Sequence, residues 1–278
     1  MGLTRRLARW AARSILNAID PTPLRAGALF NDPGAHRAGL IGIYRSRNGR
    51  HVEQMVSEAV PAGLTVALWA LDSPVPGLSH WTIGSGPGPR MRLLNRLCEG
   101  IPLSRVDHLV VCDDDVVFTR GNIAQLLSAV RRCGFGIAQP AHDARSHWSH
   151  EITVRRALTL ARLTNFVEVG PVFVVSKEWL ASVIPFPEAF GMGWGLDLVW
   201  SDLHEKGCRL GIIDAICIRH LGPVGKDYDV YAERKRLDSL LSARNPQSVN
   251  QMQRCPAMWR FWQPKPPWRP SLTLRARS

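Results

Sequence analysis

The sequence lacks several features that would assign a protein to a class directly. It has no run of roughly 18 consecutive apolar residues, so no membrane-spanning helix is predicted. Its six cysteines form no Cys-x-x-Cys pair, and several lie inside apolar runs, which favours buried thiols in a reducing compartment. A Walker A motif, internal repeats and the apolar core of a secretory signal are also missing. These absences favour a globular protein of the cytoplasm.

Acidic residues are scarce beside basic ones. The 278 residues include 35 Lys and Arg against 23 Asp and Glu, so the formal net charge is +12. This balance favours anionic partners such as nucleic acid, a phosphate-rich substrate or an acidic membrane surface. The basic residues form no dense stripe and match no nucleic-acid-binding motif, which argues against nucleic acid as the partner.

Basic residues are densest at the two ends of the chain. In the segment 1–37, apolar residues such as Leu7 and Trp10 share a helical stripe, which fits an interfacial membrane helix or a short helix packed on a domain. The segment 246–278 is a basic, Trp- and Pro-rich tail without a packed core, which either wraps the domain or touches a membrane surface. We therefore expect a domain over residues 38–245. Peripheral attachment to the inner face of the membrane stays an open alternative.

Apolar periodicity predicts strands and helices that alternate in the first half of the chain. Such alternation indicates an α/β fold with a mainly parallel central sheet flanked by helices, and the second half predicts a mixed set of strands. The expected strands are 38–46, 64–72, 106–115, 135–141, 150–156, 166–180, which leads into a short helix, and 208–220. The expected helices are 49–60, 91–100, 121–134 and 196–207.

Three of these strands end in ligand-binding residue types, at Tyr44 to Arg47, at Asp72, and at Asp113 to Asp115. In a parallel sheet such ends converge on one rim, where ligands of α/β proteins bind. Three consecutive aspartates repel one another, and a divalent cation with a bound diphosphate would offset this repulsion. A solvated acidic turn, or a capping cluster for the helix that starts near Gly121, is the alternative.

The segment VDHLVVCDDDVVF resembles the Asp-x-Asp strand end of glycosyltransferases with the GT-A fold. Other segments fall in the order of that family: Asp72 after the second strand, the loop and helix GPGPRMRLLNRL, and FGMGWGLDLVWSDLHEKGCRLGIIDAICIRHLG. The combination of WGLDL, a hydrophobic strand and a His also resembles an uncharacterised domain family thought to be glycosyltransferase-like. The resemblance covers about residues 38–225.

The resemblance implies a Rossmann-like GT-A fold and metal-dependent transfer of a hexosyl or related sugar. The donor would be a nucleotide sugar, the cofactor Mn²⁺ or Mg²⁺, and the acceptor a glycan or lipid-linked hydroxyl, as in polysaccharide biosynthesis. The implied metal ligands are Asp113, Asp115 and His220. The implied nucleotide-sugar-binding residues are Tyr44, Arg45, Asp72, Arg90, Asn95, Asp113, Asp114 and Trp194. In an extended strand Asp114 faces opposite to its neighbours, so it is either structural or bound to the sugar.

Asp197 is the expected general base. It lies in the first turn of a predicted helix, whose N-terminus stabilises a carboxylate, although a capping role would place it there as well. Glu188 lies outside the matching motif and Asp202 lies more than a turn inside the helix. Because one acceptor-side base is present without an evident covalent nucleophile, we expect inversion at the anomeric carbon.

Three other function classes stay open at this stage. A nucleotidyltransferase would use the same type of sheet and metal but attack phosphorus, and the segment YRSRNGR is basic with only one Gly where such enzymes are Gly-rich. A non-catalytic nucleotide- or nucleic-acid-binding protein, and an inactive relative that only binds its ligand, complete the set.

Overall fold

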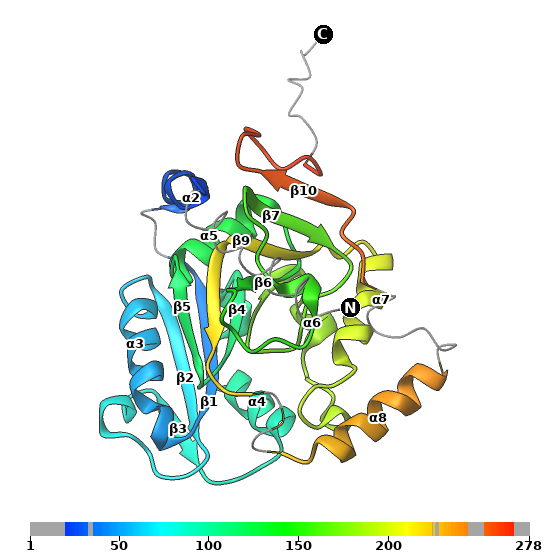
Figure 1. The fold of residues 1–278 in the computed structure, drawn as a ribbon. Coiled ribbons are helices and arrows are strands. Elements are labelled where there is room, and N and C mark those ends of the chain that lie inside the picture. The colour runs from blue at the N-terminus through cyan, green and yellow to red at the C-terminus, as the bar shows by residue number, and fades with distance from the viewer. Residues whose placement is uncertain (1–19, 33–35, 224, 226–227, 244–252, 270–278) are drawn as a thin grey trace.

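Ten strands join into one sheet in the computed structural model, which describes residues 20–32, 36–223, 225, 228–243 and 253–269 (Figure 1). The strands are β1 (Ala38–Tyr44), β2 (Leu64–Ala70), β3 (Thr82–Ser85), β4 (His108–Asp113), β5 (Val116–Arg120), β6 (Ile137–His142), β7 (Thr159–Thr164), β8 (Val172–Ser176), β9 (Leu210–His220) and β10 (Ala257–Arg260). Their order is β10-β7-β9-β6-β8-β4-β1-β2-β3, and β5 pairs with β9.

The sheet has a parallel half and a mixed half. Strands β3, β2, β1 and β4 are neighbours and run parallel, as do β6 and β9. Strand β8 is antiparallel to β4 and β6, while β7 is antiparallel to β9 and β10. The expected α/β class, with a parallel centre and a mixed second half, is therefore confirmed.

Helices cover both faces of the sheet. They are α2 (Thr22–Phe30), α3 (Gly49–Ala59), α4 (Arg90–Glu99), α5 (Ile123–Cys133), α6 (Lys177–Val183), α7 (Leu196–Glu205) and α8 (Val230–Ala243). One core cluster contains the buried side chains of α2, α3 and α5, and a second contains those of α4, α6 and α7. The burial of these apolar faces on two sides gives the three-layer arrangement visible in Figure 1.

Local sequence signals explain where α5 begins and ends. The side chain of Asn122 accepts the backbone N–H of Gln125 at 2.9 Å and thereby caps the start of α5. Gly134 ends the same helix with φ 66°, a left-handed conformation that favours glycine. The predicted boundaries of this helix were therefore close to the observed ones.

Several elements differ from the sequence expectation. The segment 150–156, predicted as a strand, contains a 3₁₀ turn at Glu151–Thr153. Strands β5 and β7 and helix α8 were not predicted, and the segment 166–171 precedes β8 without being part of it. Non-local pairing decides the two strands, because β5 and β7 both pair with β9, which lies far away in the sequence.

The C-terminal segment packs on the domain as far as it is described. Strand β10 pairs with β7, and Trp259 is fully buried in the core, where its ring meets Phe30 of α2 edge-on at a centroid distance of 5.9 Å. The expectation that this segment lacks core contacts was wrong, and between the two expected alternatives it wraps the domain. Residues 1–19, which carry the predicted amphipathic stripe, lie outside the described residues.

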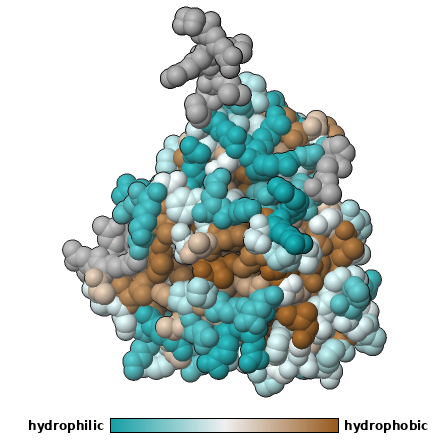
Figure 2. Space-filling view, turned by 180° about the vertical axis from the view of Figure 1, so that it is seen from behind, coloured by the Kyte–Doolittle hydropathy of each residue, from teal (hydrophilic) through white to brown (hydrophobic). Residues whose placement is uncertain are grey.

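Hydrophobic residues form a band across the face seen from behind, between hydrophilic surfaces above and below (Figure 2). Among the helices of the described residues, none combines the length and the apolar character needed to cross a membrane.

A buried ion pair ties β7 to β9. The Nε of Arg162 donates to Asp214 at 2.7 Å, and both side chains are fully buried. The other guanidinium nitrogens donate to the carbonyls of Ile152 and Val154, so the same arginine fixes the turn that leads to the sheet rim.

We expect Asp214→Ala to lower the free energy of unfolding by about 3–5 kcal/mol, because it leaves the buried charge of Arg162 without its partner. Asp107→Ala is the matched control, since its ion pair with Arg37 is exposed and should contribute at most about 1 kcal/mol. Urea unfolding measures both values. Equal losses of unfolding free energy in the two variants would show that the buried ion pair contributes no more to stability than the exposed one.

Candidate active site

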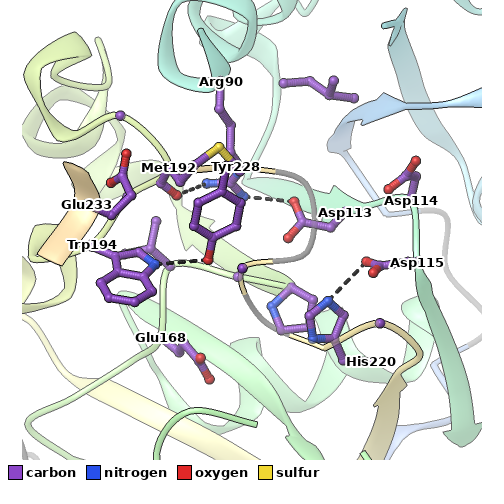
Figure 3. A pocket seen from close by; sticks show the side chains of 18 of the residues that line it. Arg90, Asp113, Asp114, Asp115, Glu168, Met192, Trp194, His220, Tyr228 and Glu233 are labelled. Carbon is purple, nitrogen blue, oxygen red and sulfur yellow. Dashed lines mark hydrogen bonds and ion pairs between the residues drawn. The ribbon is translucent and has the colours of Figure 1, made fainter. Parts of the chain in front are cut away.

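A cavity of about 710 Å³ opens over the carboxyl ends of β1, β4 and β9. Its walls come from the turn after β1, the start of α4, the loop 191–195, the start of α7 and the segment after β9. The expected site residues that line it are Arg45, Arg90, Asp113, Asp114, Asp115, Trp194, Asp197 and His220. The sheet rim therefore brings together residues that lie far apart in the sequence (Figure 3).

Asp113 faces the cavity and is paired with Arg90. The guanidinium donates to the Asp113 carboxylate at 2.9 Å and to the carbonyl of Met192 at 3.3 Å (Figure 3). Arg90 is only 8% exposed, so its guanidinium is bonded to protein groups and has little contact with solvent. It therefore joins the end of β4 to the loop 191–195.

Asp114 holds the turn that follows β1. Its carboxylate accepts the backbone N–H of Arg45 at 2.7 Å and is nearly buried. Burial raises the pKa of this carboxyl above its ordinary value, although the hydrogen bond from Arg45 opposes the shift. These contacts support the structural interpretation of Asp114.

Asp115 and His220 meet because β5 and β9 pair antiparallel. The register places Val116 opposite His220, and the Nε2 of His220 lies 3.1 Å from Asp115 Oδ1. Burial alone would lower the pKa of His220, but the hydrogen bond and the charge of Asp115 outweigh it and raise that pKa. The two side chains form one coupled unit at the cavity wall.

The donor set at this unit suits a hard or borderline divalent cation. A carboxylate oxygen and an imidazole nitrogen are ligands that Mn²⁺ accepts, and substrate phosphates and waters commonly complete such sites. Gly222 leaves room beside Asp115, because a Cβ at this position would lie 2.6 Å from Asp115 Oδ2. Within the described residues, no group of three His, Cys, Asp or Glu side chains is placed to hold a metal by itself. A cation held by Asp115 and His220 would therefore need further ligands from substrate or water.

Asp197 also lines the cavity, in the first turn of α7. Its Oδ1 accepts the backbone N–H of Leu198 at 2.9 Å, and its Oδ2 lies 3.8 Å from the Nε2 of His150. Burial first and the charge of Glu168 second raise the pKa of Asp197 to about 7, against the opposing effect of the backbone hydrogen bonds. A carboxyl group with this pKa can exchange a proton near neutral pH.

Glu168 is a cavity residue that the sequence analysis missed. It lies in FVEVG before β8, and its Oε2 is 3.4 Å from the Nε2 of the buried His142. Burial would raise the pKa of Glu168, but the interaction with His142 and the charges of the nearby histidines lower it. A single carboxylate inside an apolar run was the sequence signal that could have found it.

Aromatic residues close one side of the cavity. The indole N–H of Trp194 donates to the hydroxyl of Tyr228 at 3.2 Å, and the two rings meet edge-on at 6.3 Å between centroids (Figure 3). Tyr228 and Glu233 were also missed as lining residues, whereas Arg47 belongs to the strand end that the sequence analysis singled out. The signal was weak, because no motif surrounds these positions.

Three expected nucleotide-binding residues do not line the cavity. Tyr44 is fully buried, and its hydroxyl bonds to Thr82 and to the N–H of Val75. The side chain of Asn95 exchanges two hydrogen bonds with the backbone of Phe186. These partners hold both side chains away from the cavity, so the structure does not support their assignment.

Asp72 is exposed, and its side chain is turned toward Ser46. Its carboxylate accepts the N–H of Ser46 at 2.8 Å and the hydroxyl of the same residue at 3.1 Å. The backbone hydrogen bond from Ser46 lowers the pKa of Asp72, although burial opposes the shift slightly. Asp72 therefore fixes the turn after β1 and does not face the cavity.

Comparison with solved structures identifies the fold. The structure of GalNAc-T7 with UDP, GalNAc and Mn²⁺ matches with a TM-score of 0.55 and 9% sequence identity, over 76% of this chain and 48% of that chain. S. aureus TarS 1-349 in complex with UDP matches with a TM-score of 0.46 and 7% identity, over 74% of this chain and 70% of that chain. The chain has the GT-A fold of glycosyltransferases, and the match spans about half the length of GalNAc-T7.

Comparison of sequences does not assign the chain to a family. No family model matches the chain, and no curated protein matches it. The likeness to glycosyltransferases is therefore one of fold.

The burial of Asp197 predicts a pH-dependent cost in stability. Its pKa of about 7 exceeds the value of about 3.9 in an unfolded chain, so the folded state binds more protons between these values and loses stability as the pH rises through them. We expect Asp197→Asn to be more stable than the native protein, by about 1.4 kcal/mol for each pH unit above pH 4, levelling off near pH 7. Denaturant unfolding from pH 4 to 9 measures the difference, and equal stabilities at pH 8 would contradict it.

Proposed function

We propose that the protein is a glycosyltransferase that moves a sugar from a nucleotide-sugar donor to a hydroxyl acceptor, with inversion at the anomeric carbon. The observation that carries the proposal is that Asp197 and the pair Asp115–His220 face one cavity at the rim of a GT-A fold. These groups supply the two functions that the reaction needs, a proton acceptor and a site for the diphosphate.

The donor occupies the side of the cavity that carries positive charge. Arg45, Arg47 and Arg90 line this side together with Asp113. Arginine donors suit phosphate oxygens because of their planar, multiple N–H groups. UDP in the structures of GalNAc-T7 and TarS supports a nucleotide diphosphate as part of the donor.

Asp115 and His220 would hold Mn²⁺ or Mg²⁺, and Asp113 stands beside them in its pair with Arg90. The metal supplies charge stabilisation to the departing diphosphate when it is bound. In GalNAc-T7 the structure contains Mn²⁺ together with UDP, which supports this cofactor.

Asp197 takes the proton of the acceptor hydroxyl. The acceptor oxygen forms its bond to the anomeric carbon as the bond from that carbon to the diphosphate oxygen breaks, and the diphosphate leaves with the bonding electrons. Attack opposite the leaving group inverts the anomeric centre. Trp194 offers an aromatic face on this side, suited to a sugar ring of a glycan or lipid-linked acceptor.

The metal assignment predicts that Asp115→Ala lowers kcat/KM for transfer by about 10²–10³-fold, because the developing charge on the diphosphate loses its stabilisation. Chelator should abolish transfer by the native protein, and added Mn²⁺ should restore it. Asp107→Ala, which changes an exposed carboxylate in a surface ion pair, is the control. Transfer that is indifferent to chelator and to Asp115→Ala would exclude the metal role.

The base assignment predicts that Asp197→Asn lowers kcat by about 10²–10⁴-fold with little change in donor binding. Asp202→Asn removes a second carboxylate from the same helix, outside the residues that line the cavity, and should retain activity. Initial rates with a radiolabelled nucleotide sugar measure both. Full turnover by Asp197→Asn would assign the proton to another group.

A further inference from the structure

His150 stands beside the proposed base in the wall of the cavity. Its Nε2 lies 3.8 Å from Asp197 Oδ2, and both residues line the cavity. The two side chains are 17% and 11% exposed, so each keeps a part that a ligand can reach. His150 comes from the segment after β6 and Asp197 from the first turn of α7, so the fold brings them together from distant parts of the chain.

Two neighbours hold the imidazole ring of His150 in place. The amide Nε2 of Gln253 lies 2.9 Å from His150 Nδ1. On another side the ring of Phe166, which is buried, meets the imidazole edge-on with 4.7 Å between centroids. Gln253 lies just before β10, so the C-terminal segment contributes to the arrangement of the candidate site.

The hydrogen bond from Gln253 determines the tautomer of His150. An amide nitrogen only donates, so His150 Nδ1 is the acceptor of this bond. A neutral imidazole then carries its proton on Nε2, the nitrogen that lies 3.8 Å from Asp197. The cavity wall therefore presents a hydrogen-bond donor beside a carboxylate.

The gap between these two groups fits one oxygen atom. A distance of 3.8 Å is too long for a direct hydrogen bond between His150 and Asp197. An oxygen about 2.8 Å from Asp197 Oδ2 and about 2.9 Å from His150 Nε2 would contact both groups at normal hydrogen-bond lengths. A hydroxyl suits this position, because it donates its hydrogen to the carboxylate and accepts the N–H of the imidazole.

We propose that His150 binds the acceptor hydroxyl together with Asp197 and holds its oxygen between the two side chains. The inference rests on the proposed function, in which Asp197 is the base. The acceptor oxygen forms its bond to the anomeric carbon with a lone pair that His150 does not occupy, and its hydrogen goes to Asp197 Oδ2. The diphosphate leaves with the electrons of the broken bond, and His150 keeps its proton throughout. The imidazole thus orients the hydroxyl before the attack.

The tautomer can be tested without any substrate. NMR of the full chain labelled with ¹⁵N in its histidines, at a pH where the ring is neutral, reports which nitrogen carries the proton, and His150→Phe identifies the signals of His150. We expect the proton on Nε2 in the native protein, and a loss of this preference in Gln253→Leu. A native ring protonated on Nδ1 would overturn the proposal.

Kinetics test the contact with the acceptor, with UDP-N-acetylhexosamines and Mn²⁺ as donor mixture and methyl glycosides as acceptors. His150→Phe keeps a ring against Phe166 but removes the N–H, so kcat/KM for the acceptor should fall by about 10–100-fold. Stabilisation by UDP with Mn²⁺, measured as a thermal shift, should stay as in the native protein.

Two further variants complete the series. His150→Gln offers an amide N–H in place of the imidazole N–H, so it should retain kcat/KM within about tenfold of the native value, and it serves as the second variant if His150→Phe does not fold. His80→Phe is the matched control, because His80 also meets an aromatic ring edge-on, that of Trp81 at 5.3 Å, but lies outside the residues that line the cavity.

The outcomes separate this proposal from the proposed function. If transfer depends on Asp197 but His150→Phe keeps the native kcat/KM for the acceptor, the role of His150 is wrong and the base assignment stands. If Asp197→Asn retains full turnover while His150→Phe lowers kcat/KM for the acceptor, the contact of His150 with the acceptor is right and the base assignment is wrong. A fall that comes with lost stabilisation by UDP would overturn the proposal, because His150 would then act on the donor.

Discussion

Three consecutive carboxylates at the end of β4 set the constraint that the rest of the site depends on. Like charges at this spacing repel, and the structure separates them by giving each a partner from a different part of the chain. Asp113 binds Arg90 of α4, Asp114 binds the backbone after β1, and Asp115 binds the histidine at the end of β9. The electrostatic cost of the triplet is thus offset by contacts that assemble the cavity walls, so fold and site depend on the same interactions.

Much of the fold could be predicted because its signals are local. The apolar face of α3, the Asn122 cap and the Gly134 stop of α5, and the apolar runs of β1, β2 and β4 each show in a window of about ten residues. The strand β7 could not be recognised in this way, because TLARLT contains Arg162. That arginine becomes a core residue only through Asp214, which lies 52 residues further along the chain.

The residues of the candidate site likewise fall into those that the sequence predicts and those that it does not. Motif order located the carboxylates and the histidine, since a strand end fixes the place of a residue on the sheet rim. It could not fix the direction of side chains, which the turns decide, and Asp72 bends back to Ser46 for this reason. Glu168 was missed because its contact with His142 joins the segment before β8 to β6, and sequence spacing does not show this contact. Contacts of this kind form only in the tertiary structure, and the spacing of residues along the sequence does not predict them.

The contact between Phe30 and Trp259, and the pairing of β10 with β7 beside it, have a consequence for the synthesis of the protein. Helix α2 is among the first described segments to leave the ribosome, and β10 is among the last. The edge of β7 therefore stays uncovered until β10 has been synthesised, and uncovered strand edges recruit other chains. Pairing of β10 with β7 covers this edge, so residues about 100 positions further along the chain protect a strand that was made earlier.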